Sequence, residues 1–149
     1  MPGPHKWQHK IQGHGSRWTV PRRAVLNLLS RTSKHMSAKE IYSSLHRMYP
    51  GIGLTTVYRT LDLLVRMGLL HKFAFGTGES RYEYRSDTKE THHHHLICTQ
   101  CGKIVDYTDF VDEELELIKK TEKSLTTKHN FCITDHNIEF YGLCAKCKS

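Results

Sequence analysis

The chain has 149 residues, and its 22 Lys and Arg against 15 Asp and Glu give a formal net charge of +7, with 12 histidines not counted. This length allows one domain with a full core or two small domains, and a hydrophobic content of 38% argues against an intrinsically disordered chain. No segment reaches the roughly 18 apolar residues of a membrane span, and the opening residues MPGPHKWQHK lack the apolar centre of a signal peptide, so we expect a cytoplasmic protein with no membrane partner.

The first half of the chain predicts three helices within residues 19–67. Thr19, with a proline two residues later, is typical of a helix start. The stretch SAKE, Ser37–Glu40, is a capping box that opens the second helix. The third helix is expected over Thr55–Met67, and Gly68 suits the left-handed conformation that ends helices. LLHKFAF, the turn GTGES and SRYEY then predict a two-stranded hairpin.

Three helices followed by a hairpin describe a winged helix-turn-helix, whose third helix enters the major groove of DNA. Val57, Leu61 and Leu64 share one face of this helix and are expected to point inward. The candidates for DNA contact are Thr56, Tyr58 and Arg59 on the opposite face. Those for phosphates are Arg17, Arg22, Arg23 and Lys72. The alternative is that these are ordinary surface residues, because a solvated basic face gives the same pattern.

The second half predicts an α/β unit that forms a dimer. HHHHLIC and KIVDY are strand-like, residues 110–125 form an amphipathic helix, and FCITDHNIEFYGLC alternates like a pair of strands. A small sheet with an apolar helix is a natural dimerisation surface, and a homodimer suits two-fold-symmetric DNA. The predicted fold class is therefore α+β, with a winged-helix DNA-binding domain at 1–85 and a metal-binding dimerisation domain at 86–149.

Two Cys-x-x-C pairs, Cys98 with Cys101 and Cys144 with Cys147, are the strongest chemical signal in the sequence. Four thiolates at the corners of a tetrahedron form the closed structural site that Zn²⁺ prefers. The alternative is four unligated thiols. In a reducing compartment disulfides are disfavoured, and the fifth cysteine, Cys132, is expected to be a buried thiol.

Four adjacent histidines, residues 92–95, directly precede the first cysteine pair. If they enter a strand, His93 and His95 share one face while His92 and His94 share the other, because successive side chains alternate. One row of imidazoles would then supply two separate sites. The alternatives are a solvated His-rich loop that binds metal adventitiously and an internal affinity tag.

SAKEIY, TTVYRTLDLL, the GTGESRYEY hairpin, HHHHLICTQCGKIVDY and YGLCAKC follow one another in an order that resembles the ferric uptake regulator family of bacterial metal-dependent repressors. The resemblance covers about residues 17–147. It implies a winged-helix domain, a hinge and an α/β dimerisation domain. It also implies that metal binding positions the winged-helix domains to bind an AT-rich operator.

The resemblance also implies two sets of regulatory ligands. The sensing site would comprise His35, Glu83, His93, His95 and Asp106. A further site in the dimerisation domain would comprise His92, His94, Glu113 and His136. Imidazoles and carboxylates without thiolates suit exchangeable Fe²⁺ or Mn²⁺, for which Zn²⁺ or Co²⁺ can substitute.

The expected function is Fe²⁺-dependent repression of iron uptake genes, and the chain is not expected to be an enzyme. Glu83 is the choice of iron sensors, whereas Asp106 is found in peroxide sensors, so a peroxide-sensing repressor is the main alternative. A zinc-uptake regulator is disfavoured because zinc sensors often carry Cys at the position of Glu83. A zinc hydrolase is disfavoured because no nucleophile or general base stands out beyond the ligands.

Overall fold

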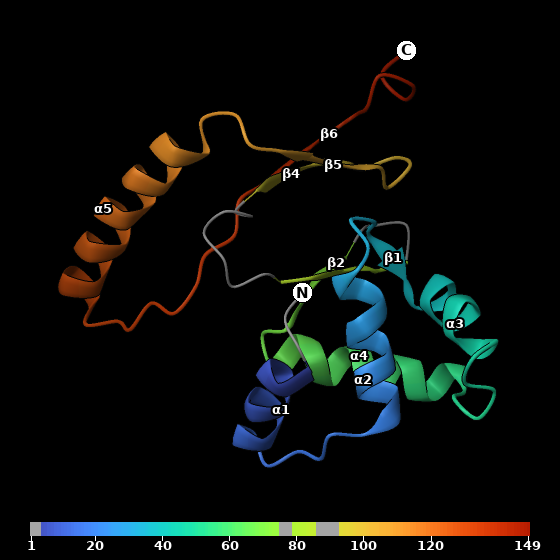
Figure 1. The fold of residues 1–149 in the computed structure, drawn as a ribbon. Coiled ribbons are helices and arrows are strands. Elements are labelled where there is room, and N and C mark those ends of the chain that lie inside the picture. The colour runs from blue at the N-terminus through green and yellow to red at the C-terminus, as the bar shows by residue number, and fades with distance from the viewer. Residues whose placement is uncertain (1–3, 75–78, 86–92) are drawn as a thin grey trace. The chain divides into compact units, whose positions relative to one another are not determined.

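A computed structural model describes residues 4–74, 79–85 and 93–149 of the chain (Figure 1). It divides into two compact units, Met1–Ser86 and Asp87–Ser149. None of the helices in the described ranges has the length and apolar character that crossing a membrane would need.

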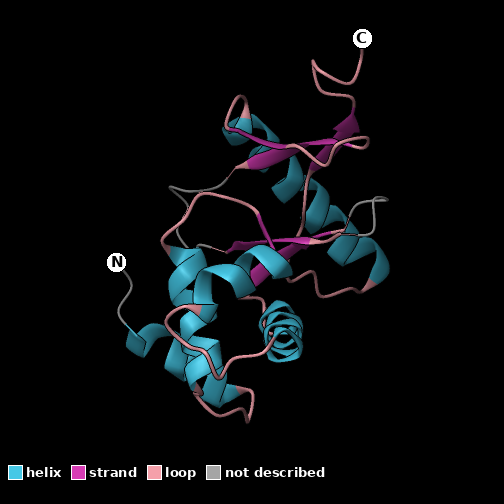
Figure 2. Ribbon diagram, turned by 90° about the vertical axis from the view of Figure 1, so that its right-hand side faces the viewer, coloured by secondary structure: helices cyan, strands magenta, loops and turns pink. Residues whose placement is uncertain are grey.

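The first unit combines four helices with a small antiparallel sheet. Its elements are α1 (Pro4–Gly13), α2 (Val20–Ser30), β1 (Met36–Ser37), α3 (Ala38–His46), α4 (Leu54–Arg66), β2 (Leu70–Phe73) and β3 (Arg81–Tyr84). The sheet order is β1-β3-β2. Figure 2 shows the helices of this unit gathered on one side of the sheet, where α2 and α4 contact it.

The three predicted helices are present, and local chemistry explains their ends. Ser37 Oγ accepts a hydrogen bond from the Glu40 amide at 3.2 Å, and Glu40 Oε2 accepts one from the Ser37 amide at 2.8 Å, which completes the predicted capping box. Gly68 follows α4 with φ +70°, a conformation that a side chain would strain. The faces of α2, α3 and α4 that meet in the core carry Val25, Leu29, Ile41, Leu45, Val57, Leu61 and Leu64, all buried.

Helix α1 and strand β1 were not predicted. In α1, Trp7 and Ile11 lie four residues apart and are both buried, and Trp7 Nε1 donates a 3.0 Å hydrogen bond to Tyr84 Oη. The i, i+4 spacing of these two residues was the available signal for a helix. Strand β1 pairs with β3 through only two residues, Met36 and Ser37, which is too short to give a periodic pattern.

The second unit has three strands and one long helix. Its elements are β4 (His94–Cys98), β5 (Ile104–Tyr107), α5 (Val111–His129) and β6 (Glu139–Gly142). The sheet order is β5-β4-β6, with β4 antiparallel to β5 and parallel to β6. The histidine-bearing strand β4 is therefore central, and both of its neighbours can position groups around it.

Three predictions about this unit were wrong in detail. Residues 131–144 contain one strand, β6, instead of a pair, because residues 131–138 run as a loop. Cys132 lies in this loop and is exposed, not buried. Phe110 is the residue before α5, with φ 58°, and α5 extends to His129 instead of ending at Leu125.

Candidate metal centres and nucleic-acid interface

The four cysteines of the two Cys-x-x-C pairs converge at one end of the second unit. Because β4 and β6 are parallel, with Cys98 beside Gly142, the segments after both strands leave the sheet at the same end. The ligand atoms of Cys98, Cys101, Cys144 and Cys147 lie within 4.8 Å of one another. The sulfurs of Cys101 and Cys144 are 3.7 Å apart, and a tetrahedral site with Zn–S bonds of about 2.3 Å needs about 3.8 Å. The geometry therefore fits one Zn²⁺ ion.

Ionisation of these thiols is unevenly distributed. Backbone hydrogen bonds, first from Cys101 and then from Cys144, lower the pKa of Cys98 to about 6. Burial opposes ionisation of Cys144, but the amides of Lys146 and Cys147 outweigh it and lower that pKa. The hydrogen bond with Cys144 is the largest cause that raises the pKa of Cys147 to about 12. The cluster thus favours the thiolate form of Cys98 and Cys144 but disfavours ionisation of Cys147. A bound dication would stabilise the thiolate form of all four cysteines, because its positive charge offsets the repulsion between them.

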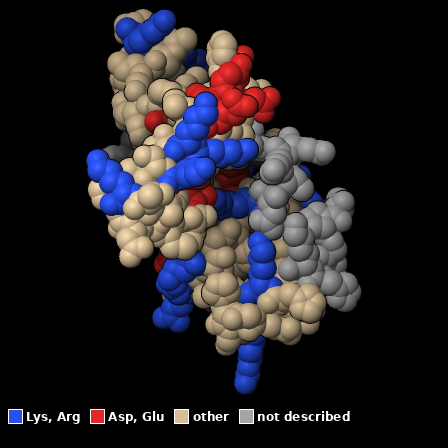
Figure 3. Space-filling view, turned by 90° about the vertical axis from the view of Figure 1, so that its left-hand side faces the viewer, with Lys and Arg blue, Asp and Glu red and all other residues tan. Residues whose placement is uncertain are grey.

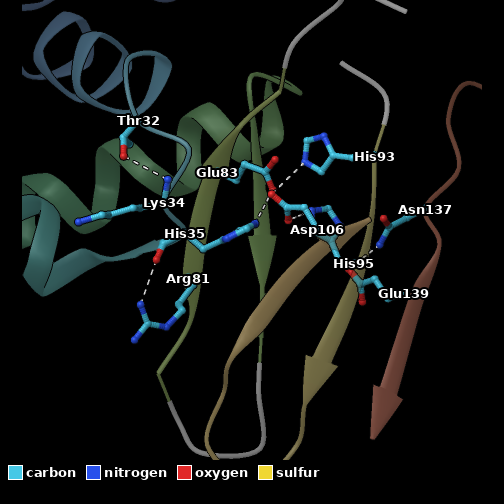
Figure 4. A network of polar contacts seen from close by, with 10 residues as sticks. All are labelled: Thr32, Lys34, His35, Arg81, Glu83, His93, His95, Asp106, Asn137 and Glu139. Atoms are coloured by element: carbon cyan, nitrogen blue, oxygen red, sulfur yellow. Dashed lines mark hydrogen bonds and ion pairs between the residues drawn. The ribbon is translucent and has the colours of Figure 1, made fainter. Parts of the chain in front are cut away.

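His93 and His95 face Asp106 within the second unit (Figure 4). His95 lies opposite Asp106 in the register of β4 and β5. His95 Nε2 is 3.5 Å from Asp106 Oδ1, and His93 Nε2 is 3.9 Å from Asp106 Oδ2. Two donors can share an ion through bonds of about 2.1 Å only when they are no more than about 4.2 Å apart. Asp106 is therefore close enough to share an ion with His93 or with His95.

His94 points to the other side of the strand, as the alternation of a strand requires. Its Nδ1 is in contact with Glu114 Oε2 at the start of α5, and the Tyr107 hydroxyl is 3.3 Å from the same nitrogen. His92 lies outside the described residues. The expected separation of His93 and His95 from His94 is present, and on this side of the strand His94 contacts Glu114.

The further site implied by the resemblance, His92, His94, Glu113 and His136, is described only in part, because His92 lies outside the described residues. Glu113 is exposed, and His136 Nδ1 is 3.0 Å from Glu122 Oε1 on α5. Glu113, which the resemblance assigns to this site, is the neighbour of Glu114 on α5, and successive side chains on a helix point about 100° apart. Sequence reasoning missed Glu114 and Glu122 because polar residues on a solvated helix carry no signal of their own. It missed Tyr107 because a tyrosine in a strand such as β5 is an ordinary strand residue.

In the first unit, His35 and Glu83 form a pair of candidate ligands. Met36 pairs with Tyr82, so His35 and Glu83, the next residues outward on their strands, lie opposite each other. His35 Nε2 is 2.9 Å from Glu83 Oε2. Arg81 Nη1 donates to the His35 carbonyl at 3.0 Å, which fixes the turn before β1 and was not anticipated from the sequence.

The predicted DNA-contacting residues lie at the surface of the first unit. Thr56, Tyr58 and Arg59 are exposed on the first turns of α4. Of the four predicted phosphate contacts, Arg17, Arg23 and Lys72 are exposed, while Arg22 is half-buried and donates to the Arg17 carbonyl. On the face drawn in Figure 3, Lys and Arg side chains are spread over the surface instead of forming one block.

An open groove of about 560 Å³ lies beside Tyr58 in the first unit. Lys39 from α3 and Lys72 from β2 line it together with the acidic side chains of Asp62 and Glu79. A groove with two cations and two carboxylates attracts a polyanion less strongly than an all-basic one. The exposed first turn of α4 therefore remains the better candidate for DNA contact.

Comparison with known proteins gives a consistent result. The sequence pattern described as "Ferric uptake regulator family" matches residues 13–141. The chain is 37% identical to the ferric uptake regulation protein of Bacillus subtilis, over 93% of this chain and 91% of that protein. It is 34% identical to the peroxide-responsive repressor PerR of Staphylococcus saprophyticus, over 93% of this chain and 86% of that protein.

The fold also agrees with solved structures. The ferric uptake regulator of Pseudomonas aeruginosa with manganese superposes with a TM-score of 0.69 at 25% identity, covering 93% of this chain and 97% of that one. The predicted α+β fold class is thereby confirmed. Because the family pattern spans most of the sequence and relatives above 30% identity cover nearly all of it, the chain belongs to the ferric uptake regulator family.

Proposed function

We propose that this protein is a metal-dependent transcriptional repressor that binds AT-rich, two-fold-symmetric operator DNA as a homodimer and responds to Fe²⁺ or Mn²⁺. The observation that carries the proposal is the coexistence of two chemically different ligand sets. Four cysteines form a closed thiolate cluster, whereas His93, His95 and Asp106 form a set without sulfur. Thiolates suit a permanent Zn²⁺, and imidazoles with carboxylates suit an exchangeable ion.

The sensing site would combine ligands from both units. The resemblance assigns His35 and Glu83, which are paired in the first unit, to the same ion as His93, His95 and Asp106 in the second. A bound divalent ion would supply a cross-link between the proposed DNA-binding domain, residues 1–85, and the proposed dimerisation domain, residues 86–149. Each unit's own contribution is to hold its donors in place before the ion arrives.

The energy of such a switch is limited by the difference in ion affinity between the linked and unlinked arrangements. A tenfold preference supplies about 1.4 kcal/mol. Shifting the protein from about 1% to about 99% competent requires a preference of about 10⁴, or about 5.5 kcal/mol. A preference of this size for the linked arrangement is attainable when three or more ligand side chains are already oriented. In that case the ion does not have to order those side chains as it binds.

Support for a homodimer comes from apolar surface in the second unit. Leu96 in β4 lies between Val105 in β5 and Phe140 in β6, and these three side chains are 44%, 40% and 52% exposed. In addition, Val111 is the one residue of α5 found buried within the described protomer. A continuous apolar row across a sheet is typical of a protein-protein interface, and a second copy of this chain offers the matching surface.

Operator binding measured against Fe²⁺ or Mn²⁺ concentration tests the proposal. His93→Ala removes a ligand from the proposed sensing site and is expected to abolish metal-dependent operator binding while zinc content and dimerisation persist. His129→Ala, which removes an exposed imidazole at the end of α5, is the matched control and should bind as the unmodified protein does. Equal metal dependence in both variants would refute the proposed site.

Peroxide sensing is the second candidate, favoured by Asp106 and by the similarity to a peroxide-responsive repressor. In that case a bound iron would promote oxidation of a ligand histidine. Treating the Fe²⁺-loaded protein with stoichiometric hydrogen peroxide separates the two functions. Loss of operator binding together with one added oxygen atom in the peptide that carries residues 93–95 supports the peroxide sensor. Retained binding with no added oxygen supports the iron sensor.

A further inference from the structure

We propose that Glu114 and Glu122 of α5 are positioning residues that orient the imidazoles of His94 and His136, so that each ring presents Nε2 to a divalent transition-metal ion. Tyr107 in turn holds Glu114 in place. This inference rests on the proposed metal dependence, but it concerns side chains that the ligand sets above do not contain. It makes α5 a support for metal ligands in addition to a proposed dimer surface.

The contact between His94 and Glu114 determines which ring nitrogen carries the proton. An ionised carboxylate only accepts hydrogen bonds, so the nitrogen that faces it must be the donor. Glu114 Oε2 faces Nδ1 of His94. The neutral ring therefore carries its proton on Nδ1, and Nε2 is the nitrogen able to bind a cation.

Tyr107 restrains the carboxylate of Glu114. It lies directly opposite His94 in the pairing of β4 and β5, and the two rings meet edge to face with centroids 5.5 Å apart. Its hydroxyl donates to Glu114 Oε1 at 3.3 Å while lying 3.3 Å from His94 Nδ1.

The same arrangement recurs further along α5. Glu122 Oε1 is 3.0 Å from His136 Nδ1, which again assigns the proton to Nδ1 and metal binding to Nε2. Glu122 follows Glu114 by two turns, about 12 Å along the helix at about 1.5 Å per residue. The His136 amide donates to Asp135 Oδ1 at 2.9 Å, so the loop that carries the ring is also held locally.

Asp106 and Glu114 face different ring nitrogens of their histidines, which distinguishes a carboxylate that can bind the ion from one that orients the ring. Asp106 faces the Nε2 atoms of His93 and His95 from 3.9 and 3.5 Å, so an ion bound at Nε2 of either ring can also touch the carboxylate. Glu114 faces the opposite nitrogen of His94, where it cannot share an ion with Nε2. Carboxylates that accept the second ring proton of a ligand histidine fix its tautomer and raise its basicity.

The test uses Co²⁺ as the probe, in protein that carries His93→Ala so that the proposed sensing site is disabled and the structural Zn²⁺ remains. In this background, Glu114→Ala is expected to weaken Co²⁺ binding by about 10–100-fold, the usual effect of losing an outer partner of a ligand histidine. Glu116→Ala is the matched control, because Glu116 is exposed on the same helix and Ala keeps the helix stable. Glu114→Gln, which keeps the shape of the side chain, is expected to give a loss in the same direction.

Nitrogen-15 NMR of the His94 ring, recorded with no Co²⁺ present, provides a readout that a general loss of structure would not imitate. The ring should be in the Nδ1-protonated tautomer in the unmodified protein and in Glu116→Ala, and should lose that preference in Glu114→Ala. Tyr107→Phe should keep the tautomer but weaken Co²⁺ binding, because Glu114 remains and only its restraint is lost.

Three results would overturn the inference. The first is an Nε2-protonated His94 in the unmodified protein, and the second is equal Co²⁺ affinity in Glu114→Ala and Glu116→Ala. A His93→Ala protein that takes up no exchangeable Co²⁺ also overturns it. In that last case the proposed repressor function stands or falls separately, on whether operator binding by the unmodified protein still requires metal.

Discussion

Replacing Tyr58 by Ala is expected to reduce the preference of the protein for its operator over random DNA without changing its fold. Tyr58 lies on the first turns of α4, and 42% of its surface is exposed. Surface substitutions of this kind change stability by no more than about 0.5 kcal/mol. Leu61, on the next turn of the same helix, is fully buried, and its replacement by Ala would instead cost about 2–5 kcal/mol of stability.

The expected loss of specificity follows from the symmetry of the complex. One base contact discriminates by about 1–3 kcal/mol. A homodimer on a two-fold operator presents Tyr58 twice, so the loss doubles to about 2–6 kcal/mol. This corresponds to a factor between about 30 and about 2 × 10⁴ in the affinity ratio. Tyr58→Phe retains the ring that would pack on a thymine methyl and should stay near the unmodified value.

Fluorescence anisotropy with an operator duplex and a shuffled duplex, at one salt concentration and saturating Mn²⁺, measures this ratio directly. Arg23→Ala serves as the comparison, because loss of a phosphate contact weakens both duplexes alike and lowers the salt dependence. An affinity ratio that Tyr58→Ala leaves unchanged would refute the assignment of base reading to this turn of α4.

Three further outcomes are expected. Cys98→Ser should yield protein without Zn²⁺ and with impaired dimerisation, measured by metal analysis and sedimentation, whereas Cys132→Ser should retain a full equivalent of Zn²⁺ because Cys132 lies outside the thiolate cluster. Leu96→Asp places a charge at the centre of the exposed apolar row and should give a monomer that keeps its Zn²⁺; a dimer of normal stability would contradict the proposed interface. Trp7→Ala should lower the free energy of unfolding by about 3–5 kcal/mol in urea titration, because Trp7 is 2% exposed and hydrogen-bonded to Tyr84.

Much of the first unit was predictable because local chemistry determines it. The capping box at Ser37, the apolar stripe of α4 and the helix end at Gly68 each depend on residues within one or two turns of chain. Strand β1 was not predictable in the same way, because its two residues become a strand only through pairing with β3.

For the metal sites, too, the residue types were predictable from the sequence, whereas part of the geometry was not. The sequence indicated which side chains could ligate, since cysteine pairs and a histidine row are chemically conspicuous. The resemblance also named Glu83 and Asp106, which face His35 and the pair His93 and His95. It did not indicate that Glu114 contacts His94, because that contact depends on where α5 begins. The left-handed conformation of Phe110 sets that start, and an aromatic residue is rarely found in this conformation.

Because β6 follows β4 by about 40 residues in the chain, the pairing of these two strands cannot form until late in synthesis. Leu96 pairs with Phe140, and at a synthesis rate of about 5–20 residues per second the two emerge roughly 2–9 s apart. During that interval one edge of β4 has no neighbour, and such an edge invites pairing with other chains. Newly made protein is therefore most prone to aggregation before β6 has been synthesised. The cysteines that follow β6 would hold this strand beside β4 through the bound Zn²⁺, so cells short of zinc should accumulate misfolded chains even when iron is plentiful.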